Sequence, residues 1–272
     1  MTLLFASATL ASLLSQTPAR PATPTTPPTP VAPAPVAQLA TPAPPPNPFS
    51  HLLTNFVRDI RHMGTAQSAW ILGAGGAGAL FVHNNHDDRL YKWVQQQDPN
   101  SNSSDIGNFL GNEVVQSGGS IALWAIGHAT KNVEAETVGS DLIRAHVLNG
   151  VLTQGIKMTV RRTRPSGSNY SFPSGHTSSS MATAAVIHSH YGFLKASPLY
   201  ALSAGIAYSR IRTNHHWLSD TVAGAALGIA AGFASSRDST SNWVVAPVKT
   251  PGGAALYLIR TSGNRAPSSL RK

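Results

Sequence analysis

The chain has 272 residues, of which 42% are hydrophobic and 11% are charged. This balance is too apolar for a wholly disordered chain and too polar for a membrane protein with six spans. The absence of cysteine excludes disulfide frameworks, thiolate metal sites and cysteine nucleophiles. Because 20 Lys and Arg residues outnumber 11 Asp and Glu residues, the net charge of +9 favours an anionic partner: a phosphate ester, an anionic membrane surface or a nucleic acid.

The N-terminal residues indicate export. Residues 1–19 begin with the uncharged run MTLLFASATLASLL and end in small residues, a pattern typical of a secretory signal peptide, although Lys and Arg are absent from the start of the run. A frayed apolar terminus is the alternative. We therefore expect the protein to be exported to the bacterial periplasm or cell envelope, with membrane association as one form of that location.

Residues 20–50 predict a disordered tether rich in Pro, Ala and Thr. The 13 prolines between Pro18 and Pro48 cannot sustain a helix or a sheet ladder. Such a spacer would hold a catalytic body away from a membrane or wall. An unselected disordered tail is an equal alternative.

Residues 51–240 predict an all-α body, a bundle of about six or more helices. The first helix begins near His51, and its spacing predicts one apolar face that consists of Leu52, Leu53, Phe56, Val57 and Ile60. Later helices are expected at residues 106–128, 133–163, 176–191 and 198–208, with Asn132 as the cap of the second of these.

Two stretches of small residues, 68–82 and 221–235, are apolar all round. Each has 15 residues, whereas a helix needs roughly 20 to span a bilayer. Their glycines and alanines favour close helix packing over a membrane span.

Residues 241–272 predict a hairpin and a tail. Two β-prone runs, 243–248 and 254–260, flank KTPGG, which is a Pro-Gly turn signal. We therefore expect a small C-terminal β-hairpin beside the helical body.

Three segments concentrate residue types that bind phosphate. In KMTVRRTRP, Lys157 and Arg164 are seven residues apart, so they are expected to project from nearly one face of a helix that Pro165 ends. The ammonium and the guanidinium together complement a phosphoryl group. Arg161 and Arg162 are interpreted as a solvated helix end.

The second segment, FPSGHTSSS, places Ser174, Gly175 and His176 at the start of an apolar helix. A flexible glycine before a helix exposes backbone N–H groups and the positive end of the helix dipole, which suits a bound anion. The Ser174 hydroxyl is a further donor, and His176 would stand beside the anion.

The third segment, SRIRTNHHWLSD, contains Arg210, His216 and Asp220. At positions i and i+4 of a helix an imidazole and a carboxylate lie side by side, so Asp220 can accept one ring N–H and leave the other nitrogen of His216 free as a nucleophile. Arg210 adds a third cation. His215 is the alternative base, but it does not share that spacing.

The motifs KX6RP, PSGH and SRX5HXXXD occur in this order, and all three are complete. Together they resemble the signatures of the type 2 phosphatidic acid phosphatase (PAP2) superfamily, which also includes bacterial class A acid phosphatases and vanadium haloperoxidases. The matched region runs from Lys157 to Asp220. The resemblance implies a PAP2-type helical bundle and a phosphoric monoester hydrolase.

The resemblance also implies a role for each matched residue. His216 resembles the nucleophile that forms a phosphohistidine, Asp220 its orienting partner, and His176 the general acid that protonates the leaving alcohol. The residues that match the phosphate-binding set are Lys157, Arg164, Ser174, Gly175 and Arg210. Preplaced cations and N–H donors would stabilise the charge that develops on the phosphoryl oxygens, so we expect neither a metal nor a cofactor.

Several alternatives stay open. The run HNNHDD, residues 83–88, is interpreted as a polar loop with Asp87 or Asp88 as a helix cap rather than as a metal site. Vanadate on His216 would make a vanadate-dependent haloperoxidase, and a non-catalytic envelope anion-binding protein is a third hypothesis. No nucleic acid is expected as a partner, because no long basic stripe alternates with aromatics.

Both lipid phosphates, such as phosphatidate or polyprenyl pyrophosphate, and small soluble esters are candidate substrates. A lipid substrate predicts an apolar cleft or a membrane-facing helix beside the site, whereas a soluble ester predicts an open polar one. A membrane surface is accordingly a candidate partner, and the oligomeric state is left open.

Overall fold

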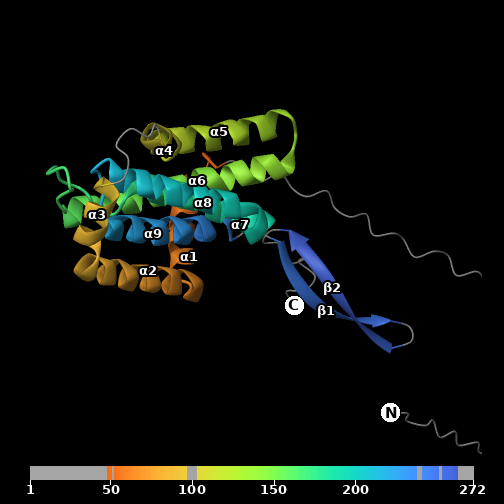
Figure 1. Cartoon of the computed structure of the whole chain (residues 1–272). Helices are drawn as coiled ribbons and strands as arrows, with labels where there is room; N and C mark the ends of the chain where they lie inside the picture. The colour runs from red at the N-terminus through yellow and green to blue at the C-terminus, as the bar shows by residue number, and fades with distance from the viewer. Residues whose placement is uncertain (1–47, 51, 97–102, 238–240, 251–252, 263–272) are drawn as a thin grey trace, which may run out of the picture. The chain divides into compact units, whose positions relative to one another are not determined.

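The computed structural model describes residues 48–50, 52–96, 103–237, 241–250 and 253–262. The predicted signal segment, residues 1–19, lies outside the described residues, as does the predicted tether up to residue 47. The residues that are described form a mainly helical unit (Figure 1).

The all-α prediction is confirmed. In chain order the described helices are α1 (Leu52–Met63), α2 (Ala66–Asn85), α3 (Asp87–Gln95), α4 (Ser103–Leu110), α5 (Glu113–Ala129), α6 (Val133–Val160), α7 (Gly175–Tyr191), α8 (Phe193–Arg212) and α9 (Leu218–Ser236). They are followed by two antiparallel strands, β1 (Ser241–Thr250) and β2 (Gly253–Ser262), in a register that runs from Ser241 opposite Ser262 to Thr250 opposite Gly253.

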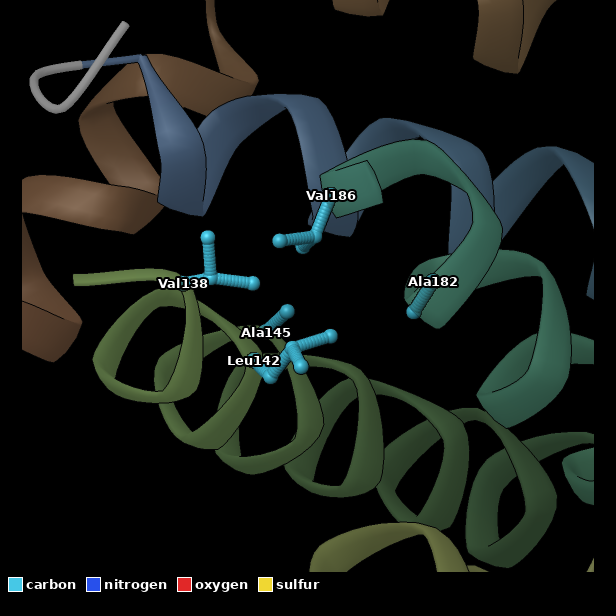
Figure 2. Close-up of a cluster of buried hydrophobic side chains, with 5 residues drawn as sticks. All are labelled: Val138, Leu142, Ala145, Ala182 and Val186. Atoms are coloured by element: carbon cyan, nitrogen blue, oxygen red, sulfur yellow. The ribbon is translucent and has the colours of Figure 1, made fainter. Parts of the chain in front are cut away.

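The longest helix, α6, supplies one side of the core. It packs against α5, α7 and α9, and α7 in turn packs along α8 and α9. The predicted cap of α6 is confirmed, because the Asn132 side chain accepts a hydrogen bond from the Ala135 amide at 3.1 Å. Figure 2 shows the contact between α6 and α7, where buried aliphatic side chains of both helices face one another: Val138, Leu142, Ala145, Ala182 and Val186.

Helix α9 lies against α7 with almost no space between the two backbones. A Cβ atom added at Gly224 would lie 2.6 Å from the Ser174 carbonyl oxygen, and one added at Gly232 would lie 2.6 Å from that of Ala182. Glycine is therefore required at both positions for this approach. Among the described helices α9 is the one long and apolar enough to cross a membrane, yet 67% of its most apolar window is buried inside the protein, as expected for a core helix.

The predicted apolar face of α1 is only partly buried: Phe56 packs against the core, but other members of the face are exposed. Leu53 is 77% exposed, and Val57 and Ile60 are also exposed, whereas Asn55 and Asp59 are buried. The reason is an ion pair with α6: Arg144 Nε donates to Asp59 Oδ2 at 3.0 Å. An apolar face on a short helix predicts burial only when no buried charge competes for the interior.

Arg144 is the centre of a buried charge cluster. Besides its ion pair with Asp59, its Nη1 donates to Asp141 Oδ1 at 3.1 Å, and Asp141 Oδ2 lies 2.9 Å from His190 Nε2. All three charged side chains are less than 7% exposed. The cluster joins α1, α6 and α7 through charges that have almost no access to water.

The surface carries many large apolar side chains. Highly exposed examples on α2, α5 and α8 are Trp70 (79%), Leu80 (65%), Phe81 (61%), Val114 (79%) and Leu194 (85%). Single exposed apolar residues are common on soluble proteins, but large ones repeated on several helices favour contact with an apolar medium or partner.

Candidate active site

The first predicted cation lies at the end of α6. Lys157 is 8% exposed in the last turn, and its Nζ donates to the Tyr170 carbonyl oxygen at 2.8 Å. Burial, followed by the charge of Arg164, lowers the pKa of Lys157 to about 8, whereas the nearby carboxylate of Asp220 opposes this shift.

The sequence prediction for Arg164 was wrong in its local structure. Helix α6 ends at Val160 rather than at Thr163, and Arg161 takes the left-handed conformation that closes it (φ 51°, ψ 30°). The chain then folds back in a loop that is tied by the Arg164 amide to the Ser168 carbonyl oxygen at 2.7 Å. Arg164 therefore reaches Lys157 from a loop and not from the same helix face, and Pro165 is not what ends the helix.

The second predicted segment forms the start of α7. Ser174 is the N-cap residue in extended conformation, and both it and Gly175 are buried. The Ser174 amide donates to the Asp220 carbonyl oxygen at 3.0 Å, and its hydroxyl accepts from Thr177 Oγ1 at 3.0 Å. These bonds fix the positive end of α7 beside the first turn of α9.

His216 and Asp220 meet, but not as neighbours on one helix. Helix α9 begins at Leu218, so His216 precedes it, and Trp217 is the N-cap residue. Asp220 reaches back and accepts the Trp217 amide at 2.8 Å, which leaves its Oδ2 atom 3.6 Å from His216 Nδ1. This is an ion-pair distance, longer than a hydrogen bond. Helix capping, rather than i, i+4 spacing within a helix, brings the two together.

The pair is buried, and its surroundings set both charge states. His216 is 3% exposed and Asp220 is fully buried. Burial lowers the pKa of His216 to about 4, against the opposing effect of Asp220. For Asp220, burial acts to raise the pKa, but the His216 ring, the Ser171 hydroxyl and the charge of Arg162 together hold it below its usual range. The structure thus favours a neutral imidazole beside an ionised carboxylate.

The third cation, Arg210, lies in the last turn of α8. It is 5% exposed, and its Nη1 donates to the Asn108 side chain on α4. Burial, followed by the charge of Arg164, lowers the pKa of Arg210 to about 10. The Nε atoms of Arg164 and Arg210 are both buried without a hydrogen-bond partner, so each retains a donor for an anion.

His176 shares the same site. Burial first, and then the charges of Arg210 and His216, lower its pKa to about 4. His215 is half-buried, and its Nδ1 lies 3.0 Å from Thr213 Oγ1. Three separate stretches of the chain therefore place two imidazoles, one carboxylate and three cations within electrostatic reach of one another.

The sequence prediction missed several residues at this site. Arg162 is not a solvated helix end, because its Nη1 donates to Asp220 Oδ1 at 2.6 Å. Asp87 is not a helix cap, since His86 holds the N-cap position of α3, and Asp87 instead accepts from Arg162 and from Ser219. No local pattern could have revealed these contacts, because the partners of Asp87 lie 75 and 132 residues away in the sequence.

Glu113 was also missed. It opens α5, and a Cβ atom added at Gly175 would lie 2.5 Å from its Oε1 atom. Burial raises the pKa of Glu113, which the charge of Lys157 opposes. Across the described ranges no group of three or more His, Cys, Asp or Glu side chains is arranged to hold a metal ion.

The fold and the site together define a class: an all-helical protein with a buried cluster of histidines and basic side chains. A family model described as the PAP2 superfamily matches residues 140–243, a segment that contains all three motifs. The resemblance found in the sequence is thereby confirmed: this segment of the chain is similar to the PAP2 superfamily.

A curated relative is similar over part of this region. A lipid A 1-phosphatase of Porphyromonas gingivalis is 37% identical over 99 residues, which are 34% of this chain and 22% of that protein. The chain thus matches about a fifth of the length of this relative.

Two solved structures are also similar. The crystal structure of Aquifex aeolicus LpxE has 22% identity and a TM-score of 0.46, and the match covers 56% of this chain and 94% of that one. The crystal structure of a transmembrane PAP2 type phosphatidylglycerolphosphate phosphatase from Bacillus subtilis has 18% identity and a TM-score of 0.36, with 70% and 94% covered.

Proposed function

We propose that the chain is an exported, metal-independent phosphatase that hydrolyses the phosphate monoester or pyrophosphate group of a lipid through a phosphohistidine intermediate. The observation that carries the proposal is the convergence of Lys157, Arg164 and Arg210 around the imidazoles of His176 and His216. Three cations next to two imidazoles suit a phosphoryl group, whose transition-state charge is spread over three oxygens.

In the first step the neutral His216 attacks phosphorus with its Nε2 atom, so a P–N bond forms as the P–O bond to the leaving group breaks. His176 gives its proton to the departing oxygen. The phosphorylated ring of His216 then carries positive charge, which the ionised Asp220 beside Nδ1 stabilises. The cations and the Gly175 amide hold the three oxygens during transfer.

In the second step His176 accepts a proton from water. The resulting hydroxide attacks phosphorus, the P–N bond breaks, and inorganic phosphate leaves while His216 regains its lone pair. The same imidazole thus serves first as an acid and then as a base. The positive charge that a metal ion would supply at the phosphoryl oxygens comes in this scheme from Lys157, Arg164 and Arg210.

The pKa values of the histidines predict an acidic optimum. His216 must be neutral to attack, so activity rises as the pH passes its pKa of about 4, whereas His176 must be protonated to act as an acid, so activity falls as the pH passes its own pKa of about 4. We expect kcat/KM to peak well below pH 6.5 and to decline toward neutrality. A pH–rate profile measures this, and His176→Gln should flatten the alkaline limb; a wild-type kcat/KM that rises up to pH 8 would contradict the assignment.

Apolar side chains beside the site support a lipid substrate. Ile106 and Phe109 on α4 are 59% and 63% exposed, and they flank Asn108, the residue that binds Arg210. Val114, also exposed, follows Glu113 in the sequence, and the exposed Tyr170 supplies the carbonyl oxygen that accepts from Lys157. We treat these four exposed residues, Ile106, Phe109, Val114 and Tyr170, as an apolar rim, and such a rim next to a cationic site would suit a phosphate that is carried on a hydrocarbon chain. The lipid A 1-phosphatase relative is consistent with this substrate class.

This rim gives a second prediction. The double substitution Ile106→Ser and Phe109→Ser is expected to raise KM for a lipid phosphate about tenfold or more, since it removes two apolar side chains that the bound hydrocarbon chain would cover. KM for p-nitrophenyl phosphate should change less than about twofold. Leu194→Ser is the matched control, because Leu194 is 85% exposed and lies on α8 about 24 Å along the helix from Arg210. Equal effects on both substrates would contradict a lipid-binding rim.

Exposed apolar side chains elsewhere on the protein support an envelope location. The large apolar side chains on α2, α5 and α8 favour association with a membrane, and the apolar run of residues 1–19 favours export. Cell fractionation of the full-length protein tests both points, with the membrane and periplasmic fractions as the expected sites.

One experiment tests the proposed activity. Purified protein is assayed for inorganic phosphate release from phosphatidate, polyprenyl pyrophosphate, lipid A and p-nitrophenyl phosphate, with a chelator present. We expect release from one or more of the lipids at a higher kcat/KM than from p-nitrophenyl phosphate. An absence of release from all four substrates, together with halide oxidation in the presence of vanadate and peroxide, would replace the phosphatase by a haloperoxidase.

A further inference from the structure

One guanidinium group links two buried carboxylates behind the proposed nucleophile. Arg162 Nη1 donates to Asp220 Oδ1 at 2.6 Å, and its Nη2 donates to Asp87 Oδ2 at 2.8 Å. The side chains of Asp220 and Asp87 are 0% and 5% exposed, and that of Arg162 is 19% exposed. The other Asp220 oxygen, Oδ2, faces His216. The charges therefore alternate in sign from Asp220 through Arg162 to Asp87.

Asp87 also anchors the segment that carries His216. Its Oδ1 accepts the Ser219 amide at 2.9 Å, and its Oδ2 accepts the Ser219 hydroxyl at 2.6 Å. Because Ser219 directly precedes Asp220, Asp87 holds the first turn of α9 by its backbone as well as through Arg162. The carboxylate of Asp220 is thus fixed at both of its oxygens and at its neighbouring residue.

Two further residues of α3 hold the other side of the same segment. Tyr91 and Gln95 follow Asp87 at intervals of four residues, so the three lie on one face of the helix. The Tyr91 hydroxyl donates to Asn214 Oδ1 at 2.9 Å, and Gln95 Nε2 donates to the Arg212 carbonyl oxygen at 3.1 Å. One face of α3 therefore contacts the chain both before and after His216.

We propose that Asp87 and Arg162 are positioning residues for the catalytic pair, which hold the Asp220 carboxylate in place and, through it, the imidazole of His216. The proposal rests on the proposed function, because it assigns these residues a role in that reaction. Arg162 keeps Asp220 ionised and oriented toward Nδ1. Asp87 offsets the positive charge of Arg162, so that Asp220 retains its attraction for the phosphorylated ring of His216.

Arg162 differs from the proposed phosphate-binding arginines in how its donors are used. Its two terminal nitrogens are both engaged with Asp220, Asp87, Ser219 and His83. By contrast, Arg164 and Arg210 each keep a buried Nε donor without a partner. Loss of Arg162 should consequently slow the chemical step without weakening the binding of phosphate.

The test uses Arg162→Lys and Asp87→Asn in the full chain. Lysine keeps the charge but cannot bridge two carboxylates as the planar guanidinium does, and asparagine keeps the shape of Asp87 but not its charge. We expect kcat for a lipid phosphate to fall about 10- to 100-fold in each variant, by analogy with the loss that follows removal of an outer partner of a metal ligand. KM, and the inhibition constant of inorganic phosphate, should each change less than about twofold.

The double variant provides a readout that a purely structural role would not give. If the two residues act as a unit, Arg162→Lys with Asp87→Asn should lower kcat about as much as either change alone. The matched controls are Arg161→Lys and Asp88→Asn, since Arg161 and Asp88 are exposed neighbours of the same residue types. Both controls should retain the wild-type kcat.

The outcomes separate this inference from the proposed function. Wild-type protein that releases no phosphate would overturn the proposed function and, with it, this inference. Active wild type with kcat unchanged in a folded Arg162→Lys or Asp87→Asn variant would overturn the positioning role alone. An inhibition constant of phosphate that rises in parallel with the loss of kcat would make Arg162 a phosphate-binding residue instead. If Asp87→Asn does not fold, Tyr91→Phe, which removes only the hydroxyl donor to Asn214, replaces it and should lower kcat severalfold with KM unchanged.

Discussion

Replacement of His216 by alanine is expected to abolish phosphate release, with a loss on the order of 10⁴-fold or more in kcat, because no other group can form the covalent intermediate. The fold should survive the change. Alanine leaves the capping bonds of α9 intact, since these join Asp220 to Trp217 and not to His216. Release of inorganic phosphate measured beside circular dichroism of the purified variant checks both expectations.

His215, which directly precedes His216, provides the matched control for this prediction. His215→Ala should retain most of the activity, because its ring is held by Thr213 and has no contact with Asp220 among the described interactions. The opposite pattern, with turnover lost in His215→Ala and retained in His216→Ala, would exchange the roles of the two residues. The acid stability of the phosphate that remains on the protein after rapid quenching identifies the intermediate. A phosphohistidine is acid-labile, whereas a phosphoester is acid-stable.

The largest expected effect on stability is at Arg144. Arg144→Leu removes the positive charge from between Asp59 and Asp141, and two carboxylates then remain buried and close to one another. Breaking a buried ion pair from one side costs about 3–5 kcal/mol of unfolding free energy, which is a large fraction of the stability of a single domain. We expect a much lower urea midpoint, or loss of folded protein.

Arg61→Leu is the matched control for this change. Arg61 is exposed on α1, so its replacement should alter the unfolding free energy by less than about 0.5 kcal/mol. Equal urea midpoints for Arg144→Leu and the wild type would mean that the buried charge cluster contributes nothing to holding α1 against α6.

Sequence reasoning could predict those parts of the site that depend on residues close together in the sequence. Short motifs were enough to select His176, His216 and Asp220 as candidates. Their charge states, by contrast, depend on burial and on residues far away in the sequence. The pairing of His216 with Asp220 was expected for the wrong geometric reason, because nothing in the motif shows that α9 starts two residues after His216.

Contacts between residues that are far apart in the sequence could not be predicted from the sequence. The left-handed conformation of Arg161, which ends α6 early, is one that non-glycine residues adopt only seldom, so a continuous helix was the better expectation. The burial of Asp59 on α1 depends on its contact with Arg144, which is 85 residues away in the sequence. Asp87 and Arg162 looked like ordinary surface charges for the same reason.

The glycine contacts between α9 and α7 have a consequence for how the proposed catalytic groups are assembled. Gly224 places the second turn of α9 directly against the Ser174 backbone, so α9, which carries Asp220, and α7, which carries His176, cannot separate without breaking this backbone packing. A substrate therefore meets a preassembled set of groups. A methyl group at position 224 would clash with the Ser174 carbonyl oxygen and push α9 away from α7. The alignment of Asp220 with His176 would then be lost before the rest of the bundle unfolded.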